Sequence, residues 1–289
     1  HAWESGRRKV ERCVRFIKLP TKWMVCLIAF VVVDAAGAGE LRMLNVGEGQ
    51  SLVLSADAKA FGFVIDTGSF ARSGRSVARL TELNRKAPRR LILTHLHPDH
   101  ASGIFDFVRA YPDMEISDNC HDFDFKKNPA TDVAIRWVEE FLRARPGVRS
   151  CLKQGDQLSL GLVSVQVLWP PANRVADGDM NSDSLVLLDS SGGFRALLMG
   201  DAGAKIETEL LARNLLPKEP IDVLVAGHHG AADAGTPEFL EKLRPAQVWV
   251  SVNLDNHWGH AGDRDLERLS KPRAKVRTTA KEGELVITF

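Results

Sequence analysis

The sequence predicts an α/β protein, because short apolar runs typical of strands alternate with amphipathic segments typical of helices. The apolar runs form two series, one in each half of the chain, and helical patterns accompany both series. Two packed sheets with helices outside would satisfy this order, and so would one plain α/β sheet, so periodicity leaves both architectures open. No internal repeat, low-complexity segment or long linker follows residue 39, which indicates one domain over residues 39–289.

Each predicted strand is a short apolar run bounded by Gly, Asp or Pro. The strands are Leu41–Asn45, Ser51–Leu54, Phe61–Ile65, Leu91–Thr94, Val163–Trp169, Leu185–Asp189, Phe194–Met199, Ile221–Ala226, Gln247–Val252 and Leu285–Phe289. The predicted helices are Ser76–Leu83 after a turn at Gly74, Thr131–Arg143, Ala204–Leu215 and Pro237–Leu243. An apolar stripe supports the second helix, and Thr236 before Pro237 is a typical start for the last.

The composition is that of a packed globular protein. Of the 289 residues, 44% are hydrophobic and 26% are charged, which argues against a disordered, collagen-like or coiled-coil chain. The formal net charge is +1, but residues 1–38 hold seven basic and three acidic residues, which leaves a net charge of −3 for residues 39–289. A nucleic-acid role would therefore need a local basic patch rather than bulk positive charge.

Residues 1–38 have the order of a secretory signal peptide. Seven basic residues precede the apolar run Trp23–Val33, and the small residues Ala36-Gly37-Ala38 fit a cleavage site. The run has 11 residues, whereas a membrane-spanning helix needs about 20. We therefore expect export to the periplasm or the medium, with a mature chain from about Gly39. An uncleaved anchor and a buried core helix are the alternatives.

Two cysteines, Cys120 and Cys151, remain after such a cleavage. An exported protein can keep a disulfide, but sequence alone does not show whether these two residues lie within bonding distance. Neither cysteine belongs to a closely spaced metal-binding pattern. The sequence leaves a bridge between them open.

The strongest chemical signal is the segment Thr94-His95-Leu96-His97-Pro98-Asp99-His100, directly after a predicted strand. Imidazole nitrogens and carboxylate oxygens suit Zn²⁺ and similar divalent ions. His95 and His97 alternate, so on an extended chain they point the same way. Asp99 and His100 follow the turn at Pro98 and can face a second ion. The spacing predicts a metal site at the end of this strand.

Two further strand ends carry metal-ligand residues. Asp201 follows the run Phe194–Met199 directly after Gly200. It is a natural carboxylate bridge between two ions, or alternatively a helix N-cap. The run Ile221–Ala226 leads into His228-His229-Gly230. His228 is the preferred ligand, and His229 is a second choice or orients its neighbours. A solvated turn is the alternative for this pair.

Together these motifs resemble the metallo-β-lactamase superfamily over most of residues 39–289. Residues 95–100 match its HxHxDH motif, Asp201 its bridging carboxylate and His228 its final ligand. Asp66-Thr67-Gly68 looks like its first motif, in which the Asp supports the metal loop. The resemblance implies a single-domain, four-layer αββα sandwich with the metals at the sheet edges.

A closer resemblance is to the ComEC-type competence branch, which takes up DNA. The segments that match motifs of this branch are Leu44–Ser51, Asn181–Leu187, His228–Gly230, Ser251–His260 and a closing segment around Arg277 and Gly283. The superfamily's third His ligand for the first metal has no counterpart in this sequence, and Asp179 or Asp183 could take its place. The membrane channel of full ComEC proteins is not part of this sequence either.

The resemblance implies a hydrolase with two divalent ions, Zn²⁺ or alternatively Mn²⁺, acting on DNA or a related phosphodiester, and the predicted leader implies that it is exported. In that reading Asp99 orients the nucleophile and His260 helps the leaving group or contacts a substrate oxyanion. The alternatives are a hydrolase of lactams, lactones or small phosphoesters, and a non-catalytic DNA- or partner-binding module. The metal site alone does not choose between these substrates.

Overall fold

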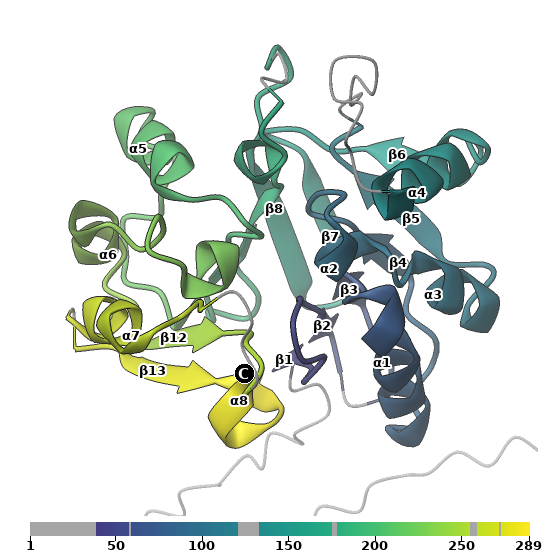
Figure 1. The fold of residues 1–289 in the computed structure, drawn as a ribbon, viewed down its shortest axis with the longest axis horizontal. Helices are drawn as coiled ribbons and strands as arrows, with labels where there is room; N and C mark the ends of the chain where they lie inside the picture. The colour runs from purple at the N-terminus through teal and green to yellow at the C-terminus, as the bar shows by residue number, and fades with distance from the viewer. Residues whose placement is uncertain (1–38, 58, 121–132, 175–177, 255–258, 272) are drawn as a thin grey trace, which may run out of the picture. The chain divides into compact units, whose positions relative to one another are not determined.

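Two mixed sheets face each other in the computed structural model, and helices cover the outer side of each sheet (Figure 1). The structure describes residues 39–57, 59–120, 133–174, 178–254, 259–271 and 273–289. Of the two architectures that the periodicity allowed, the chain adopts the αββα sandwich, in one domain. The prediction of an αββα fold is therefore confirmed.

The first sheet has seven strands among the described residues, in the order β14-β1-β2-β3-β4-β5-β6. Its strands are β1 (Glu40–Met43), β2 (Leu52–Ser55), β3 (Phe63–Ile65), β4 (Arg90–Ile92), β5 (Glu115–Asp118), β6 (Arg149–Cys151) and β14 (Leu285–Thr288). Strands β14, β1, β2 and β3 pair antiparallel, whereas β3, β4, β5 and β6 pair parallel. Because β3 to β6 are parallel, the loops that follow these strands all leave the sheet at the same edge.

The second sheet mirrors this arrangement, in the order β13-β12-β11-β10-β9-β8-β7 over the described part of the chain. Its strands are β7 (Gln157–Leu160), β8 (Val163–Trp169), β9 (Val186–Asp189), β10 (Ala196–Leu198), β11 (Val223–Val225), β12 (Gln247–Val250) and β13 (Lys275–Thr278). Strands β10 to β13 are parallel, and β7 to β10 are antiparallel.

Alternating side chains divide the apolar residues into three layers. Leu52 and Leu54 of β2 pack between the sheets against residues such as Val165 and Leu198 of the second sheet. Val53, between them in sequence, points to the opposite face and joins the outer cluster. Because both faces of each sheet are buried, the central strands are nearly continuous apolar runs.

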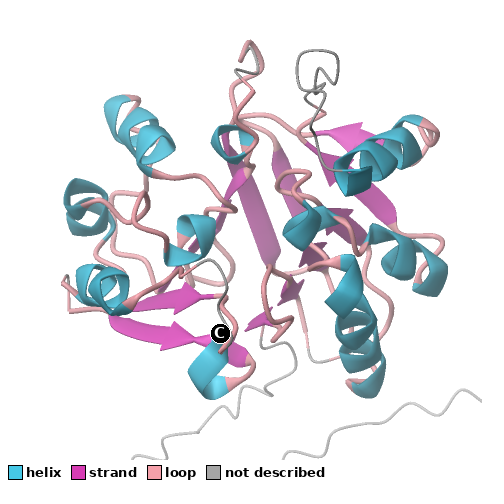
Figure 2. Cartoon of the chain, in the orientation of Figure 1, coloured by secondary structure: helices cyan, strands magenta, loops and turns pink. Residues whose placement is uncertain are grey.

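The helices form the two outer layers (Figure 2). They are α1 (Phe70–Glu82), α2 (Pro98–Ala101), α3 (Ile104–Ala110) and α4 (Val133–Arg143) beside the first sheet, and α5 (Ala204–Ala212), α6 (Pro237–Leu243), α7 (Asp263–Ser270) and α8 (Thr279–Glu282) in the second half of the chain. Leu80, Phe107 and Val138 anchor α1, α3 and α4 on the first sheet. Ile206 and Phe239 do the same for α5 and α6 on the second.

All ten predicted strands and all four predicted helices coincide with an element of the right type, but the start predicted for α1 is wrong. The helix begins at Phe70 and runs through Gly74, which we expected to be a turn. A side chain at Gly74 would meet nothing within 4 Å, so this glycine faces open space and costs only about 1 kcal/mol in the helix.

The strands that the sequence analysis missed are β5, β6, β7 and β13. Three of them, β6, β7 and β13, are edge strands of their sheets, and all four mix polar with apolar residues. An edge strand buries less of its surface than a central strand, and polar residues discourage pairing with other chains. The apolar run that we used as the strand signal is therefore absent there.

The predicted signal peptide, residues 1–38, lies outside the described residues, and so do Thr131 and the following residue at the predicted start of α4. Among the described residues, no helix combines the length and apolar character needed to span a bilayer.

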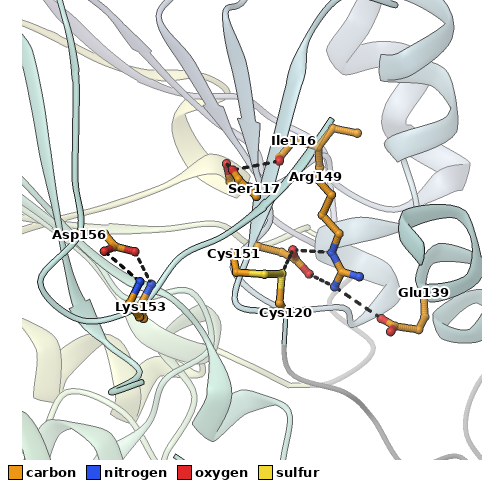
Figure 3. Close-up of a disulfide and its surroundings, with 10 residues drawn as sticks. Ile116, Ser117, Cys120, Glu139, Arg149, Cys151, Lys153 and Asp156 are labelled. Carbon is orange, nitrogen blue, oxygen red and sulfur yellow. Dashed lines mark hydrogen bonds and ion pairs between the residues drawn. A yellow bond between two sulfur atoms is a disulfide. The ribbon is translucent and has the colours of Figure 1, made fainter. Parts of the chain in front are cut away.

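The question left open for Cys120 and Cys151 is answered by the structure, which joins them in a disulfide (Figure 3). The bridge ties the loop after β5 to the end of β6. Close by, Arg149 donates to both oxygens of Asp118, at 2.9 and 2.6 Å, and lies 4.0 Å from Glu139 of α4. A covalent bond and an ion-pair network thus secure the edge of the first sheet.

The buried carboxyl group of Asp189 predicts a pH-dependent stability. Asp189 ends β9 with no exposed surface, and its Oδ2 has no hydrogen-bond partner among the described residues, while Ser191 donates to Oδ1. Burial raises the pKa of Asp189 to about 7. The folded state therefore holds this proton up to a higher pH than the unfolded state, so stability falls as the pH rises from the ordinary carboxyl pKa of about 4 through about 7 and levels off above that.

We expect Asp189→Asn, which keeps the shape without the charge, to raise the melting temperature at pH 8 by several degrees relative to wild type. At pH 4 both proteins carry a neutral group there, so the difference should vanish. Thermal unfolding at the two pH values measures it, with Asp113→Asn in an exposed turn as the control. An equal effect of Asp189→Asn at both pH values would contradict the assignment.

Candidate metal centre

The predicted site residues converge at one edge of the two sheets. Asp66 follows β3, the segment from His95 follows β4, Asp201 follows β10 and His229 follows β11. Strand β3 runs parallel to β4, and β10 runs parallel to β11. The carboxyl ends of parallel strands meet at the same edge of a sheet, which is why residues so far apart in sequence come together.

The side chains form two groups that could each hold a metal ion. The ligand atoms of Asp99, His100, Asp201 and His229 all lie within 4.8 Å of one another, and so do those of His95, His97 and Asp201. Asp201 belongs to both groups, which is the position of a bridging carboxylate. It is not the cap of α5, because Gly203 occupies the N-cap position of that helix.

The distances within the groups fit a divalent cation. His100 Nε2 lies 3.0 Å from Asp201 Oδ1 and 3.2 Å from His229 Nε2. His95 Nε2 lies 3.0 Å from His97 Nδ1 and 3.6 Å from Asp201 Oδ2. Four ligands bound tetrahedrally at about 2.0–2.1 Å would stand about 3.3 Å apart. Asp201 Oδ1 is buried and makes no well-aligned hydrogen bond within the described part of the chain. Its near neighbours are the Nε2 atoms of His100 and His229, at 3.0 and 3.6 Å, which are themselves candidate ligands of the same ion.

Hydrogen bonds on the far side of two rings orient them toward the centre. His100 Nδ1 lies 2.8 Å from Asp66 Oδ2, and His229 Nδ1 lies 3.0 Å from the carbonyl oxygen of Ser251. When Nδ1 donates to such an acceptor, Nε2 is left as the lone-pair nitrogen that binds metals. Both rings thus present Nε2 to Asp201.

Asp66 makes the contacts that its predicted supporting role requires. It accepts hydrogen bonds from the backbone N–H of Thr94 at 2.7 Å, from the Thr94 hydroxyl at 2.9 Å and from Gln50 Nε2 at 3.1 Å. Its side chain is fully buried, with His100 as the remaining partner. The carboxylate therefore fixes the first residue of the metal loop and its last histidine together.

Burial and neighbouring charges set the protonation of the group. Burial holds the pKa of His95 well below its ordinary value, and the His100 ring adds to this effect. Burial alone would raise the pKa of Asp201, but the His100 and His229 rings outweigh it and hold the pKa well below its usual range. The pKa of Asp99 is lowered against burial by the same two rings. Neutral His95 and ionised carboxylates bind cations as they stand. Against burial, Asp201 and Asp99 raise the pKa of His100 and of His229, so a bound ion would displace a proton from each of these rings.

The structure reverses our preference between the two adjacent histidines. His229 points into the cluster with its side chain only 11% exposed, whereas His228 Nδ1 faces Asp233 at 3.0 Å and joins neither group of ligand atoms. Both residues have left-handed backbone angles, with φ of 46° and 53°, in the turn Gly227–Gly230. These backbone angles decide which of the two histidines points into the ligand cluster, and no sequence pattern predicts the angles.

The two aspartates suggested for the missing third His are engaged elsewhere. Asp183 accepts from Arg174, and Asp179 accepts from the hydroxyl of Ser182. Neither carboxylate belongs to a group of ligand atoms. Both instead brace the short 3-10 turn η1 (Asn181–Asp183).

A small pocket opens beside the group of ligand atoms that contains Asp99 and His229. Its lining consists of Glu48, Gly49, Asp99, His229, Ser251, Val252, Asn253 and His260. His260 packs against His228 with ring centroids 5.1 Å apart, and burial, together with His228 and His229, lowers the pKa of His260. The proposed catalytic pair, Asp99 and His260, therefore shares one pocket. Residues 255–258 of the same motif lie outside the described residues.

Chemical reasoning missed three supporting residues that the branch motifs contained. Gln50 supports Asp66, the Ser184 hydroxyl accepts from the Asp201 N–H at 3.1 Å, and the Ser251 hydroxyl donates to the carbonyl oxygen of Gly49 at 2.6 Å. Their presence in motif positions was the available signal. None is a metal ligand by residue type, so no chemical pattern singled them out.

The fold and the arrangement of the candidate ligands are those of metallo-beta-lactamase-type proteins, and the sequence comparison identifies the family. Residues 46–246 match the model of the metallo-beta-lactamase superfamily, and the chain belongs to that superfamily. The metallo-beta-lactamase fold protein YhfI from Bacillus subtilis superposes with a TM-score of 0.54 at 12% identity, covering 87% of this chain and all of YhfI. At that identity the likeness shows the fold alone.

Two curated relatives place the chain more narrowly, in agreement with the ComEC-type resemblance. It is 32% identical to Recombination protein 2 of Haemophilus influenzae over 86% of its length, and 27% identical to ComE operon protein 3 of Bacillus subtilis over 90%. It covers only 29% and 34% of those two proteins. The chain thus spans about a third of the length of these relatives.

We expect Asp201→Ala and His229→Ala to lower metal content, the first at both sites and the second at one. Losing a ligand should weaken binding by about 100-fold or more, because even supporting residues contribute 10- to 100-fold. Metal analysis after dialysis measures this loss. Asp233→Ala and His228→Ala are the matched controls, since these residues lie outside both ligand groups. Unchanged metal content in Asp201→Ala would refute the bridging role.

Proposed function

We propose that the protein is a metal-dependent phosphodiesterase that acts on DNA or a related phosphodiester, using two divalent ions that are Zn²⁺ or alternatively Mn²⁺. The observation that carries this proposal is the pair of ligand groups sharing Asp201 beside an open pocket. Such a pair of sites suits phosphoryl chemistry, in which charge develops on both the attacking and the leaving oxygen.

Bound ions would supply Lewis acidity that lowers the pKa of a water and stabilises negative charge on the phosphoryl group. The protein's own side chains supply orientation and protons. Asp99, whose side chain is 37% exposed, lies 3.1 Å from His229 Nε2 and faces the pocket, where its ionised oxygens can accept a hydrogen bond from the attacking water. His260 is neutral at pH 7 because its pKa is lowered, so it can donate an N–H hydrogen bond to the leaving oxygen.

The preference for nucleic acid rests on the relatives and on one arginine. Recombination protein 2 and ComE operon protein 3 are the relatives that the chain resembles. Arg79 is engaged with Glu284 and Glu82. Arg72 of α1 lies against Gly47, and so does Asn253, which lines the pocket. We assign phosphate binding at the pocket rim to Arg72, because a guanidinium matches phosphate geometry.

The test is turnover of a chromogenic phosphodiester and of DNA by the metal-loaded protein, alongside lactam, lactone and thioester substrates. We expect metal-dependent phosphodiester cleavage, with Asp99→Ala lowering kcat by about 1000-fold and His260→Ala, which removes the N–H donor, by about 100-fold. Asp113→Ala, an exposed carboxylate in a turn, is the control.

Two outcomes would contradict the proposal. Ready cleavage of a lactam or lactone with DNA and phosphodiesters untouched would assign the site to the alternative hydrolase. Metal-dependent DNA binding without turnover of any substrate would assign it to a non-catalytic module.

We also propose that residues 39–289 act outside the cytoplasm. The disulfide between Cys120 and Cys151 supports this location, since such bonds persist in oxidising compartments. Basic residues precede the apolar run Trp23–Val33, an order that directs the following chain outward for a cleaved leader and for an anchor alike. The match to ComE operon protein 3 covers 90% of the chain, more than residues 39–289 supply, so it extends into the first 38 residues.

Expression of the whole chain in a bacterial host tests this location. We expect no free thiol at Cys120 or Cys151 in rapidly alkylated cells, and N-terminal sequencing near Gly39 if the segment is a cleaved leader. Leu27→Arg, which interrupts the apolar run, is the matched control and should leave both thiols reduced. Reduced thiols in the unaltered chain would contradict export, and intact residues 1–22 would contradict cleavage.

A further inference from the structure

The two ligand groups are unequal, and the first one is incomplete. The group around His229 has four side chains, whereas the group of His95, His97 and Asp201 has three His, Cys, Asp or Glu ligands among the described residues. A site of three protein ligands can keep an open position, or an unrecognised donor can fill it. The turn η1 offers such a donor, because its residue Asn181 lies beside His97.

Asn181 is the residue of that turn that points at the site. Its side chain lies within hydrogen-bonding reach of the His97 ring. Its Oδ1 is buried and makes no well-aligned hydrogen bond within the described ranges of the chain. A buried carbonyl oxygen that is poorly satisfied is costly, so this oxygen beside the His97 ring calls for a further partner.

The rest of the turn is fixed in place. The Asn181 backbone N–H donates to Asp179 Oδ1 at 3.1 Å, and its carbonyl accepts from the Ser184 N–H at 3.1 Å. Trp169 Nε1 donates to the carbonyl oxygen of Ser182 at 2.8 Å. The Asn119 side-chain amide donates to the carbonyl oxygen of Asp183 at 2.7 Å. Asn181 Oδ1 is therefore presented by a braced backbone, as a preorganised ligand should be.

We propose that Asn181 Oδ1 is the fourth protein ligand of the first metal site, together with His95, His97 and Asp201. The inference rests on the metal centre of the proposed function and assigns the position where the sequence offers no third histidine. The carboxylates of Asp179 and Asp183, the sequence-based candidates, serve the turn instead.

An amide oxygen makes this site chemically different from its neighbour. A neutral carbonyl oxygen donates less strongly to Zn²⁺ than an imidazole does, whereas carbonyl and carboxylate oxygens suit Mn²⁺. The other site has two carboxylates and two imidazoles. The two sites should therefore fill in sequence, the His229 site first, with the Asn181 site as the weaker and more manganese-tolerant one.

Calorimetric titration of the metal-free protein with Zn²⁺ and with Mn²⁺ tests the inference independently of any substrate. We expect two binding steps in the wild type. Asn181→Leu should weaken the second step by about 10-fold or more and leave the first within twofold. Asn181→Asp, which keeps an oxygen at the same place and adds charge, should bind at least as tightly as the wild type. Co²⁺ absorption spectra should show a changed coordination in the leucine variant only.

Ser182→Ala is the matched control, because it removes a hydrogen bond to Asp179 from the same turn without touching the site. Asn181→Ser gives a second truncation if the leucine variant fails to fold. Metal affinities of both truncations within twofold of wild type at both steps would overturn the inference while leaving the metal centre intact. If the wild type binds no ion, the proposed function and this inference both fail.

Discussion

The buried carboxylate of Asp66 is the interaction on which the metal centre depends. It binds the start of the metal loop at Thr94, its end at His100, and the preceding loop through Gln50. Its own backbone lies in the left-handed region, with φ of 61°, directly after β3. A buried carboxylate is costly unless its oxygens are satisfied. These three segments supply the hydrogen-bond partners of the Asp66 carboxylate, so a shift of any one of them would leave a buried, charged oxygen without its partner.

Close backbone contacts impose a second constraint. A Cβ atom on Gly49 would lie 2.2 Å from the carbonyl oxygen of Asp99, and one on Gly227 would lie 2.0 Å from that of Ala202. Only glycine allows these loops to approach so closely. The left-handed angles of His228 and His229 store about 1–3 kcal/mol each. Packed sheets behind the loops hold this strain, which places His229 Nε2 in the cluster.

Local patterns predicted most central strands and the residues that gather at the candidate site, whereas the choice of the sandwich came from the motif resemblance, because periodicity left two architectures open. Apolar runs marked the central strands, and the residues after them formed the site, since parallel strands end at one edge. What sequence missed depends on contacts that form only in the folded chain. The edge strand β6 lacks an apolar run, the choice of His229 over His228 depends on backbone angles, and Asp183 is occupied by Arg174.

The position of the charged residues explains why the metal centre can hold so many of them without disrupting the hydrophobic core. His95, His100, Asp66 and Asp201 are almost fully buried, yet they all lie beyond the carboxyl ends of strands rather than within them. The apolar layer between the sheets continues uninterrupted behind them. Their mutual pairing lowers the cost of burial but leaves Asp201 Oδ1 without a well-aligned hydrogen bond in the described part of the chain. A cation at that point would complete the balance of charge, so the architecture that stabilises the fold also prepares the place where a metal binds.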